Sequence, residues 1–162
     1  MKKHSQDQLV KSYLEKLSIK FKIHTHPAVY TCEEADKYCG NIAGIHSKNL
    51  LIKGKKTGNF YLAILPDKKR LDLKFLKLKF GEEFTFANDA DLESLLAVKT
   101  GAVSPFTLIN DVDGKITLLL DKEIQASDIV SFHPNINTET LELSQNDFQK
   151  FISSLKNRVE II

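Results

Sequence analysis

Two apolar runs near the middle of the chain, residues 48–53 and 59–65, are separated by only five residues. The segment between them, Gly54-Lys55-Lys56-Thr57-Gly58, has a glycine at each end and predicts a β-hairpin. The two strands of a hairpin are antiparallel neighbours in one sheet. The sequence therefore predicts an antiparallel pair of strands near the centre of the fold.

A second pair of apolar runs, 106–109 and 115–120, flanks residues 110–114 and predicts another hairpin. Helices mixed with hairpins disfavour the regular strand–helix–strand order of a doubly wound parallel sheet. We expect an α/β chain of the α+β type, with one domain over residues 1–162. Its core would be a mixed, mostly antiparallel curved sheet, or a barrel-like one, with helices packed on it.

Polar residues with the character of helix caps precede several amphipathic segments. The helices are predicted to begin at Ser5, Thr31, Asp72, Asn88 and Ser144. The helix after Thr31 is expected to end near Gly40 in the left-handed conformation that glycine tolerates. Further strands are predicted at residues 21–24, 84–87, 129–132, 138–143 and 159–162.

A chain of 162 residues can bury about two thirds of its unfolded surface, so it needs no metal or disulfide to fold. No apolar run approaches the length of a membrane span, and the polar start of the chain lacks the apolar stretch of a signal peptide. Cys32 and Cys39 are seven positions apart, which matches neither a zinc knuckle nor a redox Cys-x-x-Cys pair. We expect a cytoplasmic protein with no membrane partner.

The formal net charge is only +2, but the lysines are unevenly distributed. Basic clusters occur at residues 53–56, 68–70 and 74–79. Such clusters fit either the phosphate backbone of a tRNA or an ordinary solvated face.

Three separated segments carry polar groups that a hydrophobic core does not need. They are residues 44–50, 101–105 and 132–138. Lys48 and Asn49 lead directly into the apolar run Leu50-Leu51-Ile52, so we expect them at the mouth of a buried strand, facing a cleft. A lysine in that position indicates an anion, or a developing negative charge, close by.

These segments belong to an ordered series of motifs. The third segment contains His133-Pro134-Asn135-x-Asn137-Thr138, and the other motifs are His26-Pro27-Ala28-Val29-Tyr30-Thr31, Asp72-Leu73-Lys74 and Leu108-Ile109-Asn110-Asp111. From about His26 to Ile161 the chain resembles the freestanding aminoacyl-tRNA editing proteins of the YbaK and prolyl-tRNA-synthetase-insertion type, closest to the alanyl-tRNA(Pro) deacylases. The resemblance implies a YbaK-like fold and hydrolysis of mischarged Ala-tRNA(Pro) in trans. It also implies tRNA as the binding partner and prolyl-tRNA synthetase as a candidate partner.

The resemblance further implies that Lys48 grips the phosphate or sugar of the terminal adenosine, with Asn49 bonding nearby. The loop that begins at Gly101 supplies backbone N–H groups for the oxyanion, because Gly101 tolerates unusual dihedrals and Pro105 fixes the exit. His133 serves either as a general base or as a brace that positions substrate; we favour positioning, since these sites look poorly supplied with protein bases and the neighbouring ribose hydroxyl is thought to help activate water. The predicted catalytic residues are Lys48, Asn49, Gly101 and His133.

Other residues beside these motifs are predicted to contact substrate. His26 would shape the turn beside the pocket, and Thr31 would cap a helix while remaining free to touch substrate. A synthetase pocket sized for proline cannot strongly exclude the smaller alanine, because missing methylenes cost only about 1 to 3 kcal/mol each, so a second, smaller sieve must remove the product. The candidates for lining that sieve are Ile45, Ala102, Val103 and Phe106. The predicted substrate-binding residues are His26, Thr31, Ile45, Ala102, Val103, Ser104, Pro105, Phe106 and Asn135.

We predict no metal and no cofactor. His24, His26 and His46 are the candidate ligands, and they lack a placed carboxylate or cysteine.

Glu139 departs from the family pattern, which has a small residue there, and should face away from Thr138 and Thr140 in a strand. Alternative functions are a deacylase for Cys-tRNA(Pro) or for seryl or threonyl species, a non-catalytic module that binds aminoacyl-tRNA, and a small-molecule-binding domain.

Overall fold

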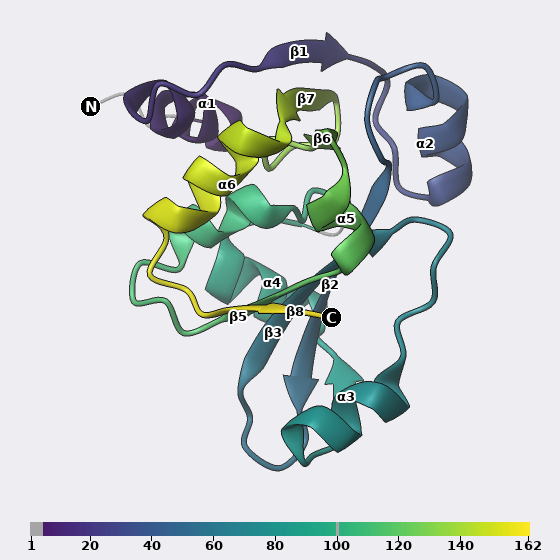
Figure 1. Cartoon of the computed structure of the whole chain (residues 1–162), viewed down its shortest axis with the longest axis vertical. Helices are drawn as coiled ribbons and strands as arrows, with labels where there is room; N and C mark the ends of the chain where they lie inside the picture. The colour runs from purple at the N-terminus through teal and green to yellow at the C-terminus, as the bar shows by residue number, and fades with distance from the viewer. Residues whose placement is uncertain (1–4, 100) are drawn as a thin grey trace.

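The computed structural model describes residues 5–99 and 101–162, which fold as a mixture of helices and strands (Figure 1). The helices are α1 (Gln6–Lys16), α2 (Cys32–Cys39), α3 (Leu73–Phe80), α4 (Asp89–Leu96), the 3-10 helix η1 (Pro105–Asn110), α5 (Lys122–Ala126) and α6 (Gln145–Ser154). The strands are β1 (Lys22–Thr25), β2 (Ser47–Gly54), β3 (Phe60–Pro66), β4 (Phe84–Phe86), β5 (Thr117–Leu120), β6 (Ile129–Phe132), β7 (Glu139–Ser144) and β8 (Val159–Ile161).

The strands form two sheets. A five-stranded sheet has the order β4-β2-β3-β5-β8, and a three-stranded sheet has the order β1-β7-β6. Antiparallel pairing joins β4, β2 and β3 and all of the smaller sheet, whereas β5 lies parallel to both β3 and β8. An isolated bridge between Ile45 and Val130 connects the two sheets. The mixed, mostly antiparallel α/β fold is confirmed.

The barrel-like alternative is wrong, because the larger sheet remains open. Its edges are β4 and β8, strands of three residues each, and these edges do not pair with each other. The predicted hairpin of strands 48–53 and 59–65 is present as β2 and β3, and its register runs from Ser47 opposite Pro66 to Lys53 opposite Phe60.

The second predicted hairpin is also wrong. Residues 106–109 belong to the 3-10 helix η1 instead of a strand, and β5 pairs in parallel with β3. Pro105 occupies the first turn of η1, and the Ser104 hydroxyl caps it by accepting the Phe106 N–H at 3.1 Å. A four-residue apolar run fits a buried helical turn as well as a strand, so periodicity could not separate the two.

Smaller differences concern helix ends. Gly40 ends α2 with φ −59°, in the right-handed region, and not in the left-handed conformation predicted for it. The short helix α5 was not predicted; the Asp121 carboxylate caps it by accepting the Glu123 N–H at 2.8 Å.

Among the described residues, no helix has the length and apolar character that crossing a bilayer requires.

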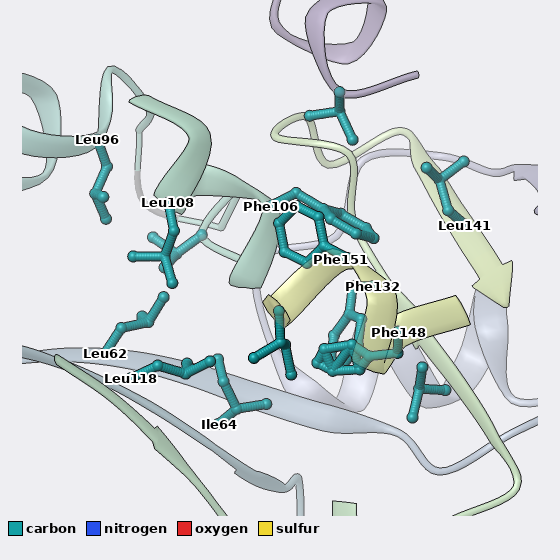
Figure 2. Packing of buried hydrophobic residues seen from close by; sticks show 14 of the residues in the cluster. Leu62, Ile64, Leu96, Phe106, Leu108, Leu118, Phe132, Leu141, Phe148 and Phe151 are labelled. Atoms are coloured by element: carbon teal, nitrogen blue, oxygen red, sulfur yellow. The ribbon is translucent and has the colours of Figure 1, made fainter. Parts of the chain in front are cut away.

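The main core lies between the five-stranded sheet and helix α6 and contains a cluster of buried phenylalanines among aliphatic side chains (Figure 2). Phe148 and Phe151 on one face of α6 are fully buried, and their rings lie 4.9 Å from Phe132 and 5.1 Å from Phe106, centroid to centroid. A second, smaller core lies on the other face of the sheet, under α3. Phe132 ends β6, so the aromatic core anchors the backbone immediately before His133.

Candidate functional site

A cleft of about 470 Å³ opens beside the first half of β2. All four residues predicted to be catalytic line it: Lys48, Asn49, Gly101 and His133. They come from β2, from the loop after α4 and from the loop after β6, so segments far apart in the sequence meet here. Two predicted substrate-binding residues, Thr31 and Val103, line the same cleft.

The pairing of β2 explains where the cleft lies. Strand β4 pairs with β2 only across Ile52–Gly54, and the Ala87 N–H then donates to the Leu51 carbonyl at 2.9 Å before the chain turns into α4. The beginning of β2 keeps only its pairing with β3, with Lys48 opposite Leu65. Within the described residues, the edge of β2 next to Asn49 therefore has no strand partner and faces the cleft.

Lys48 and Asn49 both carry polar groups without protein partners in the described part of the chain. Lys48 makes no ion pair or hydrogen bond there, and it is the one Lys or Arg among the residues that line the cleft. The Asn49 Oδ1 atom is buried and accepts no hydrogen bond from any described residue. Buried polar atoms are normally satisfied, so this site is suited to a ligand that brings hydrogen-bond donors and negative charge.

His133 has a defined orientation. Its Nδ1 lies 2.8 Å from the backbone carbonyl of Glu139, a contact that assigns the proton to Nδ1 and leaves Nε2 as an acceptor. Burial lowers the pKa of the His133 imidazole below its ordinary value; the Glu139 carbonyl opposes this effect, and nearby His26 adds to it. The ring is therefore neutral at neutral pH.

His26 lies behind His133 and does not line the cleft. Its Nε2 is 2.8 Å from the Thr140 hydroxyl and its Nδ1 is 2.9 Å from the Pro27 carbonyl. The two imidazole centroids are 5.8 Å apart. Backbone bonds from the His26 N–H to Thr138 and from the Val29 N–H to Asn137 also join this segment to the loop that follows His133. His26 is thus placed to support the site from a second layer.

The Gly-x-x-x-Pro loop lies between the cleft and the core. Gly101 has φ +93°, a conformation that L-residues rarely adopt, and a Cβ there would lie 3.4 Å from the Tyr30 ring. Thr100 lies outside the described residues. Val103 faces the cleft, whereas Ala102, Pro105 and Phe106 are buried in the core.

The remaining predicted substrate contacts also lie behind the cleft wall. The Ser104 hydroxyl donates to Asn135 Oδ1 at 3.3 Å, and Asn135 has the left-handed φ of +61°. Ile45 forms the bridge between the sheets. The structure thus separates the predicted substrate-binding set into Thr31 and Val103 at the cleft and seven residues that do not line it: His26, Ile45, Ala102, Ser104, Pro105, Phe106 and Asn135.

Thr31 combines two positions, as expected. Its hydroxyl accepts the Glu34 N–H at 3.1 Å and so caps α2, while the residue also lines the cleft.

Glu139 points away from the cleft, and its carboxylate pairs with Lys11 of α1 at 2.7 Å. His24 pairs with Glu142, and the described residues contain no cluster of three or more side chains able to hold a metal ion.

The basic clusters are partly neutralised by acidic neighbours. Lys69 pairs with Asp121 at 2.8 Å, and Lys55 and Lys77 both lie within 4 Å of the Glu83 carboxylate. These pairs favour a structural explanation for much of the clustered charge.

Several residues that line the cleft were not predicted: Val29, Tyr30, Ser47, Leu50, Leu51, Phe86, Ala87, Asp89 and Leu92. Phe86, Ala87, Asp89 and Leu92 reach the cleft because β4 stops pairing with β2 early and the chain then turns into α4. The others come from the segment before α2 and from β2 itself. These placements depend on the tertiary fold and carry no local signal in the sequence. A smaller cavity of about 50 Å³ adjoins the cleft, with polar walls that include Ser47, Asn49 and His133.

Comparisons with known proteins point to one family. The sequence profile of the aminoacyl-tRNA editing domain matches residues 26–151. The chain is 32% identical over 156 residues to the prolyl-tRNA editing protein ProX of Acetoanaerobium sticklandii, covering 96% of this chain and 95% of that protein. It is also 32% identical over 146 residues to prolyl-tRNA synthetase associated domain-containing protein 1 of Bos taurus, covering 87% of this chain and 85% of that one.

A solved structure, described as a candidate trans-editing enzyme for prolyl tRNA synthetase, has the same fold. It superposes with a TM-score of 0.71 at 20% identity, covering 99% of this chain and 98% of that one. The sequence profile and the extent of the similarity to ProX show the family directly. This chain belongs to the aminoacyl-tRNA editing domain family.

Proposed function

We propose that this protein is a trans-acting aminoacyl-tRNA deacylase that hydrolyses the ester of mischarged Ala-tRNA(Pro). The observation that carries the proposal is the meeting of Lys48, Asn49, Gly101 and His133 in one cleft of a chain from the editing family. The relatives named for prolyl-tRNA editing and for association with prolyl-tRNA synthetase favour tRNA(Pro) as the carrier and that synthetase as a partner. We propose that the protein acts in the cytoplasm.

The reaction requires little beyond orientation and charge stabilisation. An aminoacyl-tRNA is an activated ester between the carboxyl group of an amino acid and a ribose hydroxyl. Water attacks the carbonyl carbon, and collapse of the tetrahedral intermediate breaks the bond to the ribose oxygen. That oxygen leaves as a hydroxyl group, which releases the free amino acid and the tRNA.

Each predicted catalytic residue has a part in this scheme. The unpaired Lys48 ammonium binds the phosphate or sugar of the terminal nucleotide, because a compact point charge suits a phosphate. The Ala102 N–H already donates to the Lys99 carbonyl at 3.1 Å, so the oxyanion donors that we propose are the other backbone N–H groups of the loop at Gly101. One preorganised donor is commonly worth about 3 to 4 kcal/mol. Asn49 holds the substrate through its unsatisfied Oδ1.

His133 positions substrate or water without taking a full charge. Its Nδ1–H is occupied by the Glu139 carbonyl, so Nε2 accepts a hydrogen bond from a water molecule or a ribose hydroxyl. Burial, which lowers the pKa of His133, opposes formation of imidazolium and favours this positioning role over proton transfer. The adjoining cavity of about 50 Å³ is large and polar enough to hold water beside the ring.

Selectivity for a small amino acid comes from the apolar part of the cleft. Val29 and Val103 line it, and both are buried. We propose that these two side chains limit the space for the acyl group. Ile45, Ala102 and Phe106, which were predicted for this role, support the wall from behind.

Deacylation of a substrate panel tests the proposal: Ala-tRNA(Pro), Cys-tRNA(Pro), Ser-tRNA(Ala) and Pro-tRNA(Pro), each with wild type, Lys48→Ala and the control Lys20→Ala. Lys20 is exposed and lies outside the cleft. We expect rapid loss of the alanyl ester with wild type and Lys20→Ala, and little with Lys48→Ala. If the protein preferred the cysteinyl or seryl ester, that ester would replace Ala-tRNA(Pro) as the proposed substrate. Binding of tRNA without hydrolysis of any ester would indicate a binding module.

A further inference from the structure

Phe86 is an aromatic side chain that the fold leaves exposed at the cleft. It is 57% exposed and lines the cleft, and within the described part of the chain it contacts no other aromatic ring. Phe84, two residues earlier on the same strand, is 6% exposed and packs edge-on against Tyr61 at 5.2 Å. Two phenylalanines on one face of β4 thus have opposite environments, and only Phe84 is needed by the core.

Phe86 lies on the same face of the sheet as Lys48. It is directly opposite Ile52 in the β2–β4 register, and side chains paired in this way share a face. Lys48 precedes Ile52 by four positions, an even number, so its side chain also lies on that face, about 13 Å along the strand by the usual rise per residue. Leu50 lies between them and lines the cleft.

This spacing suits one nucleotide. A lysine side chain extends several ångströms from its backbone, so a sugar or phosphate held by Lys48 places the base of the same nucleotide toward Phe86. Aromatic side chains beside a positive charge are the usual means by which proteins hold single-stranded nucleic acid. Tyr30 is also exposed at the cleft, but its ring lies against Gly101, at the end proposed for the acyl group.

We propose that Phe86 is a positioning residue that stacks on the base of the terminal nucleotide of the aminoacyl-tRNA. The inference rests on the proposed function, because it assumes that Lys48 holds the same nucleotide. Stacking on an aromatic ring is worth about 1 to 3 kcal/mol per base and tolerates any base. Phe86 would therefore hold the acceptor end without reading tRNA identity.

The test uses two non-hydrolysable competitors of Ala-tRNA(Pro) deacylation. One is adenosine carrying alanine through an amide at the 3′ position, and the other is the same alanyl ribose without a base. The inhibition constant of each is measured for wild type, Phe86→Ala, Phe86→Leu, Phe86→Trp and the control Phe75→Ala. Phe75 is a 46% exposed phenylalanine on α3, outside the cleft.

We expect Phe86→Ala to raise the inhibition constant of the adenosine compound about 5-fold to 150-fold and to leave that of the base-free compound unchanged. Phe86→Leu should weaken the adenosine compound in the same direction, Phe86→Trp should retain or tighten binding, and Phe75→Ala should behave as wild type. A melting temperature for each variant establishes that it is folded.

Equal effects of Phe86→Ala on the two compounds would overturn the stacking role, as would a Phe86→Leu protein equal to wild type. Both results would assign Phe86 to a general apolar contact, such as one with a protein partner. These outcomes are distinct from failure of the proposed function, in which wild type itself would not hydrolyse Ala-tRNA(Pro).

Discussion

The two walls of the cleft differ in how their polar groups are satisfied. On the wall behind His133, the His26 imidazole bonds to the Thr140 hydroxyl and the His133 imidazole bonds to the Glu139 carbonyl. On the opposite wall, Lys48 has no partner among the described residues and the Asn49 oxygen accepts no hydrogen bond from them. A satisfied wall contributes to folding and holds its geometry, whereas an unsatisfied wall is completed by the ligand.

The largest expected effect is on the unsatisfied wall. Lys48→Ala should lower kcat/KM for Ala-tRNA(Pro) about 100-fold, because losing one partner of a desolvated charge contact costs about 2 to 5 kcal/mol. The melting temperature should change little, since the Lys48 side chain makes no ion pair or hydrogen bond with the described residues. Deacylation kinetics and thermal unfolding of the same preparation measure kcat/KM and the melting temperature. A large fall in melting temperature with an intact kcat/KM would mean that Lys48 serves folding and not the substrate.

Gly101→Val should reduce kcat by about 10-fold or more while leaving a folded protein. The native φ of +93° strains any L-residue by about 1 to 3 kcal/mol, and the added side chain meets the Tyr30 ring and the Val29 carbonyl. The loop must shift, which misaligns the proposed oxyanion donors. Gly101→Ala is a milder change, and its kcat should lie between those of wild type and Gly101→Val. If a stable Gly101→Val protein were fully active, the loop would be a simple connection without a catalytic role.

Thr140→Val tests the satisfied wall and should act mainly on stability. The change removes the hydroxyl that bonds His26 Nε2 and leaves a buried imidazole nitrogen unpaired, at a cost of about 1 to 3 kcal/mol in the free energy of unfolding. Denaturant unfolding should show this loss, and Thr140→Ser should restore most of it. If Thr140→Val abolished turnover and kept full stability, the hydroxyl would belong to the reacting groups.

The smallest expected effect is on pH dependence. Burial lowers the folded-state pKa of His133 below its ordinary value of 6.5, so the unfolded chain binds the proton more readily. This contribution to stability is complete above the unfolded pKa and is lost as the pH falls through 6.5 toward the folded value. Melting temperatures at pH 7.5 and 5.5 should therefore differ less for His133→Gln than for wild type, and an unchanged difference would mean that other groups determine it.

Local sequence signals predicted much of the fold because they depend on short-range chemistry. The turn at Gly54–Gly58 specified β2 and β3, and the cap residues Asp72 and Asn88 placed two helices. The apolar run at 106–109 failed because proline and the Ser104 cap turned it into a buried helical turn. A run of that length contains no periodicity long enough to reveal such a change.

The same distinction holds for the site. The meeting of Lys48, Asn49, Gly101 and His133 at one cleft was predictable because they lie in separated polar segments whose order resembles that of the editing family. Their local positions alone would have fitted an ordinary strand edge and an ordinary loop. Phe86 was not predictable, because a phenylalanine in a short strand normally packs in a core. Its exposure depends on how many residues of β4 pair with β2, a property of the assembled sheet.

The short β4 has one further consequence, for behaviour at high concentration. Unpaired strand edges are templates on which other chains add strands and aggregate. In this protein the free edge of β2 is short, lies inside a cleft and carries Lys48, and inward-facing charge is a common protection for such edges. Lys48 would thus act as a gatekeeper against self-association as well as a ligand for the substrate, and its removal should lower solubility even in a fully folded protein.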